Sequence, residues 1–545
     1  MITLEAIGHF SRRALARLET MPLSAAGWFT AFGALVVLRN FLEGISQRQL
    51  NVLDADNLPF LAHASAFYLV MFGAMILGLA VFTGERFERV SRFVLVLSGV
   101  IVLAPLFDLF ATGGTGATMA YRTFGGPPSF AAFSDLALWS PFGLLFWPGT
   151  ASATDLQMNF GIRLEIMLIF LALIWYVYLK TGSPIRFLTF IFFLYVGLYA
   201  VSALPLFLSS SAAPSGRFLL LGHPAAWFPS FDGANTVLFA VYVALALVIA
   251  LVLAWSGARR FVRVAVKNIR SERLLVNLAL FGGGVALGLG RSPALGAPRF
   301  FDWLVIGLGL ALVVFRWVWA VSRNDLADEV SDKLNAPGRP LPSGVLSRPE
   351  MATLSRAVGL AALVISSALG TRAFFLTVLW GCVAYLYSEA PFRLKRYPII
   401  SNLLLGGAHL LTVLTGFVLV GELYLADFPA KFAVLFLVGA AFGAEFINIK
   451  DAEGDKKTGV LTIPNIFPGL LGRRLVGFMG AFVFFAVPLA YPAAASLLVP
   501  LAFFASIFYY CAAARTPYKE AYVFLTYAGY VAAFVALIIS GYLVL

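Results

Sequence analysis

Charged residues are scarce in this sequence of 545 residues: they make up 12% of it, whereas an ordinary soluble domain has roughly 25%. Apolar residues account for 61%, and the mean hydropathy is +0.89. Because so little polar surface cannot cover a water-soluble body of this size, a cytosolic enzyme is excluded. Intrinsic disorder is excluded as well, since it requires low hydrophobicity. The sequence therefore predicts an integral membrane protein.

Cysteine and acidic residues are also few. The two cysteines, Cys382 and Cys511, lie inside apolar runs and exclude a disulfide framework or a cysteine-based metal centre. Asp and Glu number 27 against 39 Lys and Arg, which gives a net charge of +12. In a membrane protein such an excess collects in cytoplasmic loops. We therefore expect these charges to face a lipid bilayer and not a nucleic acid.

The long apolar runs predict the membrane topology. A spanning helix needs about 20 mostly apolar residues. Fifteen such runs occur, near 23–44, 62–83, 93–112, 161–180, 185–207, 233–256, 274–291, 300–321, 352–369, 372–389, 398–420, 430–448, 474–491, 494–513 and 520–544. If the N-terminus is cytoplasmic, most Lys and Arg fall in inner loops, as the positive-inside rule requires. We expect an all-α integral membrane protein in which a six-helix domain precedes a nine-helix bundle.

A basic stretch divides the two sets of spans. Residues 258–272 are rich in Arg and Lys, and we interpret them as a cytoplasmic connector that faces lipid headgroups. Binding of a partner is the alternative. The predicted domains are thus 1–257, this connector and 273–545. In the first domain no motif indicates a function: charged residues near span ends, such as Arg39, Glu43 and Glu165, either line a ligand pocket or pair with one another.

The first acidic cluster follows the second span of the nine. Asp325, Asp328 and Asp332 lie at i, i+3 and i+7 and so share one face of a helix, with Asn324 directly before them. Carboxylates at this spacing repel each other and destabilise a helix. A cation must neutralise them, and clustered oxygen ligands are typical of Mg²⁺. A solvated helix end is the alternative interpretation.

A second cluster follows the sixth span of the nine and repeats this spacing with Asn448, Asp451 and Asp455. We expect both clusters on the cytoplasmic side, where Mg²⁺ can bridge carboxylates to a diphosphate and stabilise charge on the leaving group. The predicted catalytic carboxylates are Asp325, Asp328, Asp451 and Asp455. The predicted metal ligands are these four together with Asn324, Asp332 and Asn448.

Basic and polar residues near the clusters are candidates for binding the diphosphate. Arg339 lies in the proline-rich loop 335–344, Lys395 and Arg396 follow Tyr387 in the next inner loop, and Lys456 adjoins the second cluster. Fixed cations beside a metal-bound diphosphate would stabilise departing pyrophosphate. Membrane anchoring by positive-inside charges is the alternative.

These motifs resemble the signatures of the UbiA-type intramembrane prenyltransferases. Residues 324–332 with 335–344 are similar to the first signature, 451–455 to the second, and 387–395 with Asn402 to a loop between them. The resemblance covers about 270–545. It implies a nine-helix bundle around a cavity open to lipid, with Mg²⁺ as cofactor and a polyprenyl diphosphate as donor. The chain departs from the family at Asn448, where many members have Asp, and at 270–277, which lacks the usual Arg-Pro or Lys-Pro.

Two further polar residues lie inside predicted spans. Arg316, in the second span of the nine, faces either a cavity or a partner for an ion pair. His409, in the fifth, is either a hydrogen-bonded core residue or a contact of the acceptor. With Asn402, these residues are the candidates for lining a cavity.

The predicted function is Mg²⁺-dependent ionisation of a prenyl diphosphate to an allylic cation, followed by transfer to a lipophilic acceptor. Acceptors of the quinone-precursor aromatic, chlorophyllide-like and glyceryl-lipid types all remain open. The alternative is a transporter or lipid-handling protein whose acidic clusters bind cations. Ion pathways place charges near mid-span, whereas these aspartates lie at span ends, which favours the enzyme. We expect a prokaryotic plasma membrane with the active-site loops on its cytoplasmic side.

Overall fold

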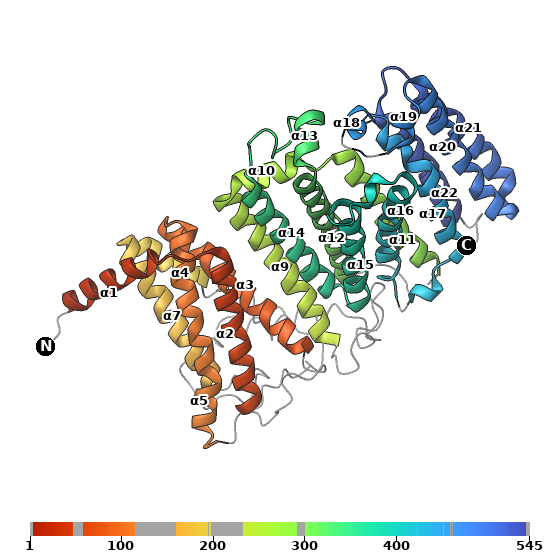
Figure 1. Cartoon of the computed structure of the whole chain (residues 1–545). Coiled ribbons are helices and arrows are strands. Elements are labelled where there is room, and N and C mark those ends of the chain that lie inside the picture. The colour runs from red at the N-terminus through yellow and green to blue at the C-terminus, as the bar shows by residue number, and fades with distance from the viewer. Residues whose placement is uncertain are drawn as a thin grey trace. The chain divides into compact units, whose positions relative to one another are not determined.

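The computed structural model describes residues 4–46, 58–114, 160–194, 196–197, 233–291, 300–421, 423–450, 452–457, 459 and 461–540. Within these residues the chain forms helices and no β-strand (Figure 1). Twelve of the described helical segments are long and apolar enough to cross a membrane. The prediction of an all-α membrane protein is therefore confirmed.

The chain divides into two compact units, one of residues 1–217 with 224–259 and the other of 218–223 with 260–545. The helices of the first unit are α1 (Leu4–Glu19), α2 (Ala25–Ser46), α3 (Leu58–Thr83), α4 (Phe87–Ser98), α5 (Leu103–Ala111), α7 (Phe160–Thr181) and α9 (Gly233–Gly257). A 3₁₀ turn, η1 (Gly99–Val102), joins α4 to α5. The core of this unit contains Phe72, Leu79 and Leu173, each 1% exposed or less.

Polar side chains at membrane depth in the first unit are buried and partly paired. Arg39 and Glu43 form an ion pair of 3.0 Å on α2. Asp108 on α5 accepts a hydrogen bond of 2.7 Å from the backbone N–H of Gly161. Pairing thus accounts for part of the charge in this half of the chain.

The second unit begins with α10 (Arg259–Lys267), which corresponds to the basic connector. The helices that follow are α11 (Ser271–Arg291), α12 (Phe300–Ala327), α13 (Glu329–Asn335), α14 (Arg348–Ala368), α15 (Thr371–Ser388), α16 (Pro398–Phe417), α17 (Ala430–Gly443), α18 (Ala452–Lys457), α19 (Ile463–Ile466), α20 (Leu470–Ala490), α21 (Ala495–Ala514) and α22 (Glu520–Ile539). The short helices α13, α18 and α19 lie toward one end of this unit in Figure 1.

Three of the fifteen expected spans are not among the twelve segments. Residues 372–389 and 520–544 correspond to α15 and α22, which are helices but are not in that set. The run 185–207 is described only in part, as a shorter apolar helix, Pro184–Leu194. The division into six and nine spans therefore stays a prediction.

Close contact between α11 and α16 fixes one wall of the second unit. A Cβ added at Gly284 would lie 2.0 Å from the carbonyl oxygen of Val413, and one at Gly416 would lie 2.2 Å from that of Phe281. Only glycine allows backbones to approach this closely, as is common between membrane helices. Both helices contribute side chains to the cavities described next.

Candidate active site

A cavity of about 470 Å³ opens in the second unit, beside the ends of α12 and α15. Its lining combines the polar residues of the first acidic cluster with tryptophans and aliphatic side chains. Helices α11, α12, α15 and α16 contribute, together with the loop that contains Arg393 and Lys395. The polar part includes Asn324, Asp328 and Asp332, whereas the side chain of Asp325 does not line the cavity.

The acidic cluster lies where α12 passes into α13. Helix α12 ends at Ala327 and α13 begins at Glu329, so Asp328 occupies the junction. Backbone hydrogen bonds from Asp328 N to Asn324 O (2.9 Å) and from Asp332 N to Asp328 O (2.8 Å) continue the helical register across it. The spacing therefore brings these residues together, and Asn324 Nδ2 donates to Asp328 Oδ2 at 3.0 Å.

Asp325 is the most deeply buried carboxylate of the cluster, at 1% exposure. Its Oδ2 accepts a hydrogen bond of 2.6 Å from Asn268, and its Oδ1 lies 2.9 Å from a guanidinium nitrogen of Arg270. Arg339 lies 3.6 Å from the same Oδ1. Two residues of the segment between α10 and α11 thus hold a predicted metal ligand.

The other two aspartates also contact cations. Asp328 pairs with Arg393 at 3.0 Å and with Lys395, while Asp332 pairs with Arg339. Burial raises the pKa of Asp332, although the hydrogen bond from Arg339 acts in the opposite direction. Burial likewise lowers the pKa of Lys395 against the pull of Asp328. The site therefore concentrates cations around carboxylates whose side chains are 13% exposed or less.

The predicted diphosphate contacts fall into two groups. Arg339, Lys395 and Tyr387 line the cavity. Arg396 instead contacts the carbonyl oxygen of Phe392 and the ring of Tyr397, and Lys456 is exposed. Neither of these two lines the cavity in the described part of the chain.

The second cluster is described only in part. Asn448 lines the cavity and donates to Glu445. Asp451 and the side chain of Asp455 lie outside the described residues. Helix α18, which carries residues 452–457, packs against α13. This contact brings the backbone segments of the two motifs to the same end of the unit.

Many residues of the cavity wall did not follow from the sequence motifs. Those with charged or amide side chains include Asn268, Arg270, Arg273, Arg393 and Lys450. Burial lowers the pKa of Arg270, which also has a positive φ of 52°. The backbone carbonyl of Ile269, between Asn268 and Arg270, accepts a hydrogen bond from Trp317 of α12. The sequence feature that could have indicated them is the mostly polar segment 268–273. It directly precedes a predicted span, at the same predicted membrane face as both acidic clusters.

A second cavity, of about 270 Å³, is almost wholly apolar. It lies among α11, α16, α17, α20 and α22, and its lining includes Phe432, Phe436 and Phe534. Val276, Leu405, His409, Ile447 and Phe524 line both cavities. The two volumes are therefore neighbours, with His409 where they meet.

Arg316 and Asn402 lie elsewhere. Arg316 is 2% exposed, contacts the hydroxyls of Thr412 and Thr415 at 3.2 Å each, and lies 4.7 Å from the ring centre of Trp380. Asn402 donates to the carbonyl oxygen of Ala441 at 3.1 Å. Among the described residues, neither lines one of the two cavities.

Comparison with known proteins relates the second unit to a described family. The model of the UbiA prenyltransferase family matches residues 285–527. The chain is similar to digeranylgeranylglyceryl phosphate synthase of Thermococcus gammatolerans, with 32% identity over 206 residues that make up 38% of this chain and 67% of that one. It is also similar to chloroplastic chlorophyll synthase of Oryza sativa, with 32% identity over 153 residues, 26% of this chain and 40% of that one.

The matched regions differ in the share of each relative that they cover. The chain spans less than two thirds of the length of several curated relatives that it matches. Among solved structures, a UbiA homolog from Archaeoglobus fulgidus bound to DMAPP and Mg²⁺ aligns with 51% of this chain and 98% of its own. The TM-score is 0.40 at 20% identity.

Proposed function

The chain belongs to the UbiA prenyltransferase family, and from this premise we propose that it transfers a polyprenyl group from a prenyl diphosphate to a lipophilic acceptor. It is a multi-pass integral membrane protein. The observation that carries the proposal is the junction of a charged cavity with an apolar one. That pairing suits a molecule with an anionic head and a hydrocarbon chain.

The residues of the charged cavity fit Mg²⁺. Asp328 and Asp332 present carboxylates to it, and Asn324 and Asn448 present amide groups. Such hard oxygen donors are those that Mg²⁺ prefers, and its remaining positions suit phosphate oxygens. We propose Asp325, Asp451 and Asp455 as the other ligands. When bound, Mg²⁺ would supply positive charge to the leaving diphosphate.

The protein's own cations act on the same leaving group. Arg339, Arg393 and Lys395 are held at the cavity by Asp328 and Asp332, within hydrogen-bonding reach of a phosphate placed there. As the C–O bond breaks, its electron pair passes to the diphosphate oxygen, and fixed N–H donors stabilise that charge. Tyr387 offers a further hydroxyl. Arg396 and Lys456 lie off the cavity, and we assign them no role.

The apolar cavity holds the isoprenoid chain and keeps water from the allylic cation. Trp317 and Trp380 line the charged cavity and offer π faces to a carbocation. The acceptor's nucleophilic atom then bonds to the allylic carbon and loses a proton. We place the acceptor near His409, between the two cavities. The acceptor belongs to the aromatic, the chlorophyllide-like or the glyceryl-lipid class. The names of the relatives refer to the last two of these classes.

Asn268 and Arg270 act as positioning residues in this proposal. They hold both oxygens of Asp325 and so fix the orientation of its side chain. We further propose that the N-terminus and both clusters face the cytoplasm of a prokaryotic cell, and that 1–257, 258–272 and 273–545 are functional divisions of the chain.

The test is pyrophosphate release from a prenyl diphosphate by the purified full chain in nanodiscs, with and without Mg²⁺. Prenylated product is identified by mass spectrometry against a panel of the three acceptor classes. Release only with Mg²⁺, together with product from one class, supports the proposal. Protein that binds Mg²⁺ but releases no pyrophosphate with any acceptor would overturn it in favour of transport or lipid handling.

A further inference from the structure

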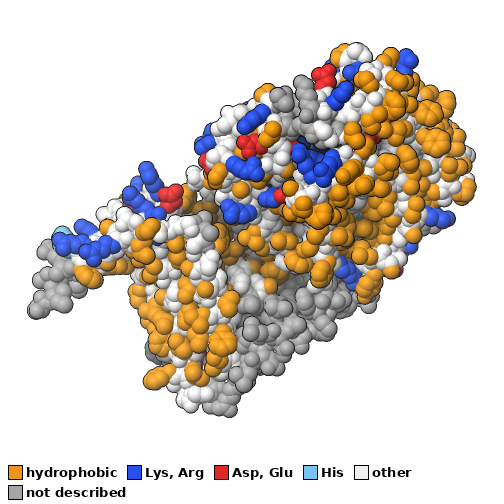
Figure 2. Space-filling view, in the orientation of Figure 1, with side chains coloured by type: hydrophobic (Ala, Val, Ile, Leu, Met, Phe, Trp, Pro, Cys, Tyr) orange, Lys and Arg blue, Asp and Glu red, His pale blue; other side chains and the backbone are white. Residues whose placement is uncertain are grey.

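The N-terminal helix α1 has a basic surface that the catalytic proposal does not use. Arg12, Arg13 and Arg17 are exposed on it, and Phe10 is 75% exposed. In Figure 1, α1 extends away from helices α2 to α7 of its own unit, and Figure 2 shows Lys and Arg side chains gathered along it. Within the described part of the chain, none of the three arginines forms an ion pair.

The order of residues along α1 places its apolar and its basic side chains on different faces of the helix. At 100° per residue, Phe10, Ala14, Leu15 and Leu18 fall on one side, while Arg12 and Arg13 point away from it and Arg17 lies at the boundary. Leu15 packs against the core of the first unit, whereas Phe10, a turn and a half earlier, does not. A helix with basic and apolar faces of this kind lies in the interface of a membrane.

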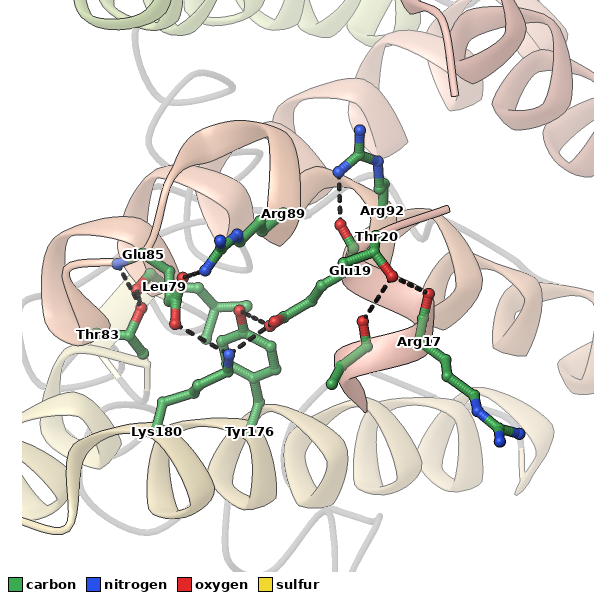
Figure 3. Close-up of polar contacts among 11 residues, drawn as sticks. Arg17, Glu19, Thr20, Leu79, Thr83, Glu85, Arg89, Arg92, Tyr176 and Lys180 are labelled. Carbon is green, nitrogen blue, oxygen red and sulfur yellow. Dashed lines mark hydrogen bonds and ion pairs between the residues drawn. The ribbon is translucent and has the colours of Figure 1, made fainter. Parts of the chain in front are cut away.

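A buried polar contact fixes where α1 ends. Lys180 Nζ on α7 lies 2.7 Å from Glu19 and 2.9 Å from Glu85, and the Tyr176 hydroxyl donates to Glu19 at 2.9 Å (Figure 3). Arg92 donates to the backbone carbonyl of Glu19. We call these four side chains with Glu19 the clasp. Because Glu19 is 4% exposed, the clasp holds the C-terminal end of α1 against α4 and α7.

The acids of the clasp are engaged by Lys180, and none of the three arginines, which lie two to seven residues before Glu19, is ion-paired with them in the described part of the chain. The surface therefore has the composition of an anionic-lipid site: three arginines, an exposed phenylalanine, and Met21, 55% exposed, just beyond the clasp. Phosphate groups of lipids accept hydrogen bonds from guanidinium, and the acyl boundary accepts the apolar side chains.

We propose that α1 lies flat in the membrane interface and binds the headgroups of anionic phospholipids through Arg12, Arg13 and Arg17. The clasp sets its depth and Phe10 enters the acyl boundary. Each arginine near an anionic surface contributes about five-fold to affinity, so three of them discriminate strongly between anionic and zwitterionic lipid.

The experiment uses the full chain with Cys382 and Cys511 replaced by Ser and a single Ala14→Cys carrying an environment-sensitive fluorophore. The protein is placed in nanodiscs of phosphatidylcholine with increasing phosphatidylglycerol. We expect the emission to shift to that of an apolar environment as phosphatidylglycerol is added. Replacing all three arginines with Gln should raise the mole fraction of phosphatidylglycerol that gives half of the emission shift at least five-fold. About 1 M salt should have the same effect, because it shortens the Debye length to about 3 Å.

A matched control removes two exposed charges far along the chain, Arg356→Gln with Lys431→Gln. This control should keep the wild-type lipid response. Equal emission in both lipids for the wild type, or an unchanged response in the triple variant, would overturn the proposal. Thermal unfolding confirms that each variant is folded, because exposed charges contribute little to stability.

Discussion

Replacing Asp325 with Asn tests the most deeply buried carboxylate of the first acidic cluster. The side chains have nearly the same shape, so packing is kept while the charge that holds Arg270 at 2.9 Å is lost. Breaking a buried pair leaves one charge unpaired, at a cost of about 3–5 kcal/mol. The side chain of Arg270 is 23% exposed and keeps water contact, so we expect the loss of unfolding free energy to lie at the lower end of this range, about 3 kcal/mol.

The same change should lower turnover by more than 100-fold, which corresponds to about 2.7 kcal/mol of barrier. Stability is measured by thermal unfolding in nanodiscs and turnover by pyrophosphate release. Asp427→Asn, an acid-to-amide change at an exposed 3₁₀ turn, is the matched control and should keep full turnover. A variant at position 325 that retains more than about a tenth of the rate would refute its role as metal ligand.

A double-mutant cycle separates this contact from general disruption. Asp325→Asn, Arg270→Gln and the double variant should give a coupling energy of about 1–3 kcal/mol, because the two side chains touch. A coupling below about 0.5 kcal/mol would mean that the segment 268–270 does not hold Asp325. Asn268→Ala, which removes one hydrogen bond to a buried carboxylate, should cost about 1.5–3 kcal/mol.

Three further predictions concern topology, pH and the division of the chain. Single cysteines at Ser343 and Lys457 should react with a membrane-impermeant reagent from one side and a cysteine at Leu545 from the other; labelling of the first two from opposite sides would exclude a shared diphosphate site. The Lys180 hydrogen bond holds the pKa of Glu85 below its usual 4.5. The ionised carboxylate therefore stabilises the first unit above about pH 4.5, and this stabilisation is lost as the pH falls through the pKa of the folded state. The unfolding temperature of Glu85→Gln should depend less on pH in this range than that of the wild type, and parallel curves for the two proteins would contradict this. A chain of residues 265–545 retains Asn268 and Arg270 and should still release pyrophosphate with Mg²⁺; a monodisperse but inert protein would place part of the active site in the first six spans.

The sequence predicted those parts of the site that depend on local spacing. Asn324, Asp328 and Asp332 gather because helical register sets their separation, and Arg339 and Lys395 follow from loops tied to the same motif. The sequence did not predict the roles of Arg393 and Arg270, because these roles depend on which side chain each arginine contacts across the bundle. No periodicity in a single segment encodes such pairings.

The contacts of Arg316 also could not be predicted from a single segment of the sequence. A charge in the middle of a span predicts either a cavity or an ionic partner, and the structure instead gives it two threonine hydroxyls and a tryptophan face. Threonine at 412 and 415 carries no signal of such a role in an apolar run. The family resemblance implied a cavity, but apart from His409 the residues that line the apolar cavity could not be predicted, since they come from five helices far apart in the chain.

The glycine contact between α11 and α16 has a mechanical consequence. Backbones that touch at Gly284 and Gly416 leave no compressible side chains between them, so the two helices move as one rigid body. In the proposed function, an isoprenoid chain occupies the apolar cavity that these helices border. The opposite wall is packed closely as well, because a Cβ added at Gly406 of α16 would lie 2.2 Å from the Cβ of Ala440 on α17, and one at Gly443 would lie 2.2 Å from the hydroxyl of Tyr527 on α22. We therefore expect entry of such a chain to depend on rotamer changes of the side chains that line the cavity, and not on separation of α11 from α16.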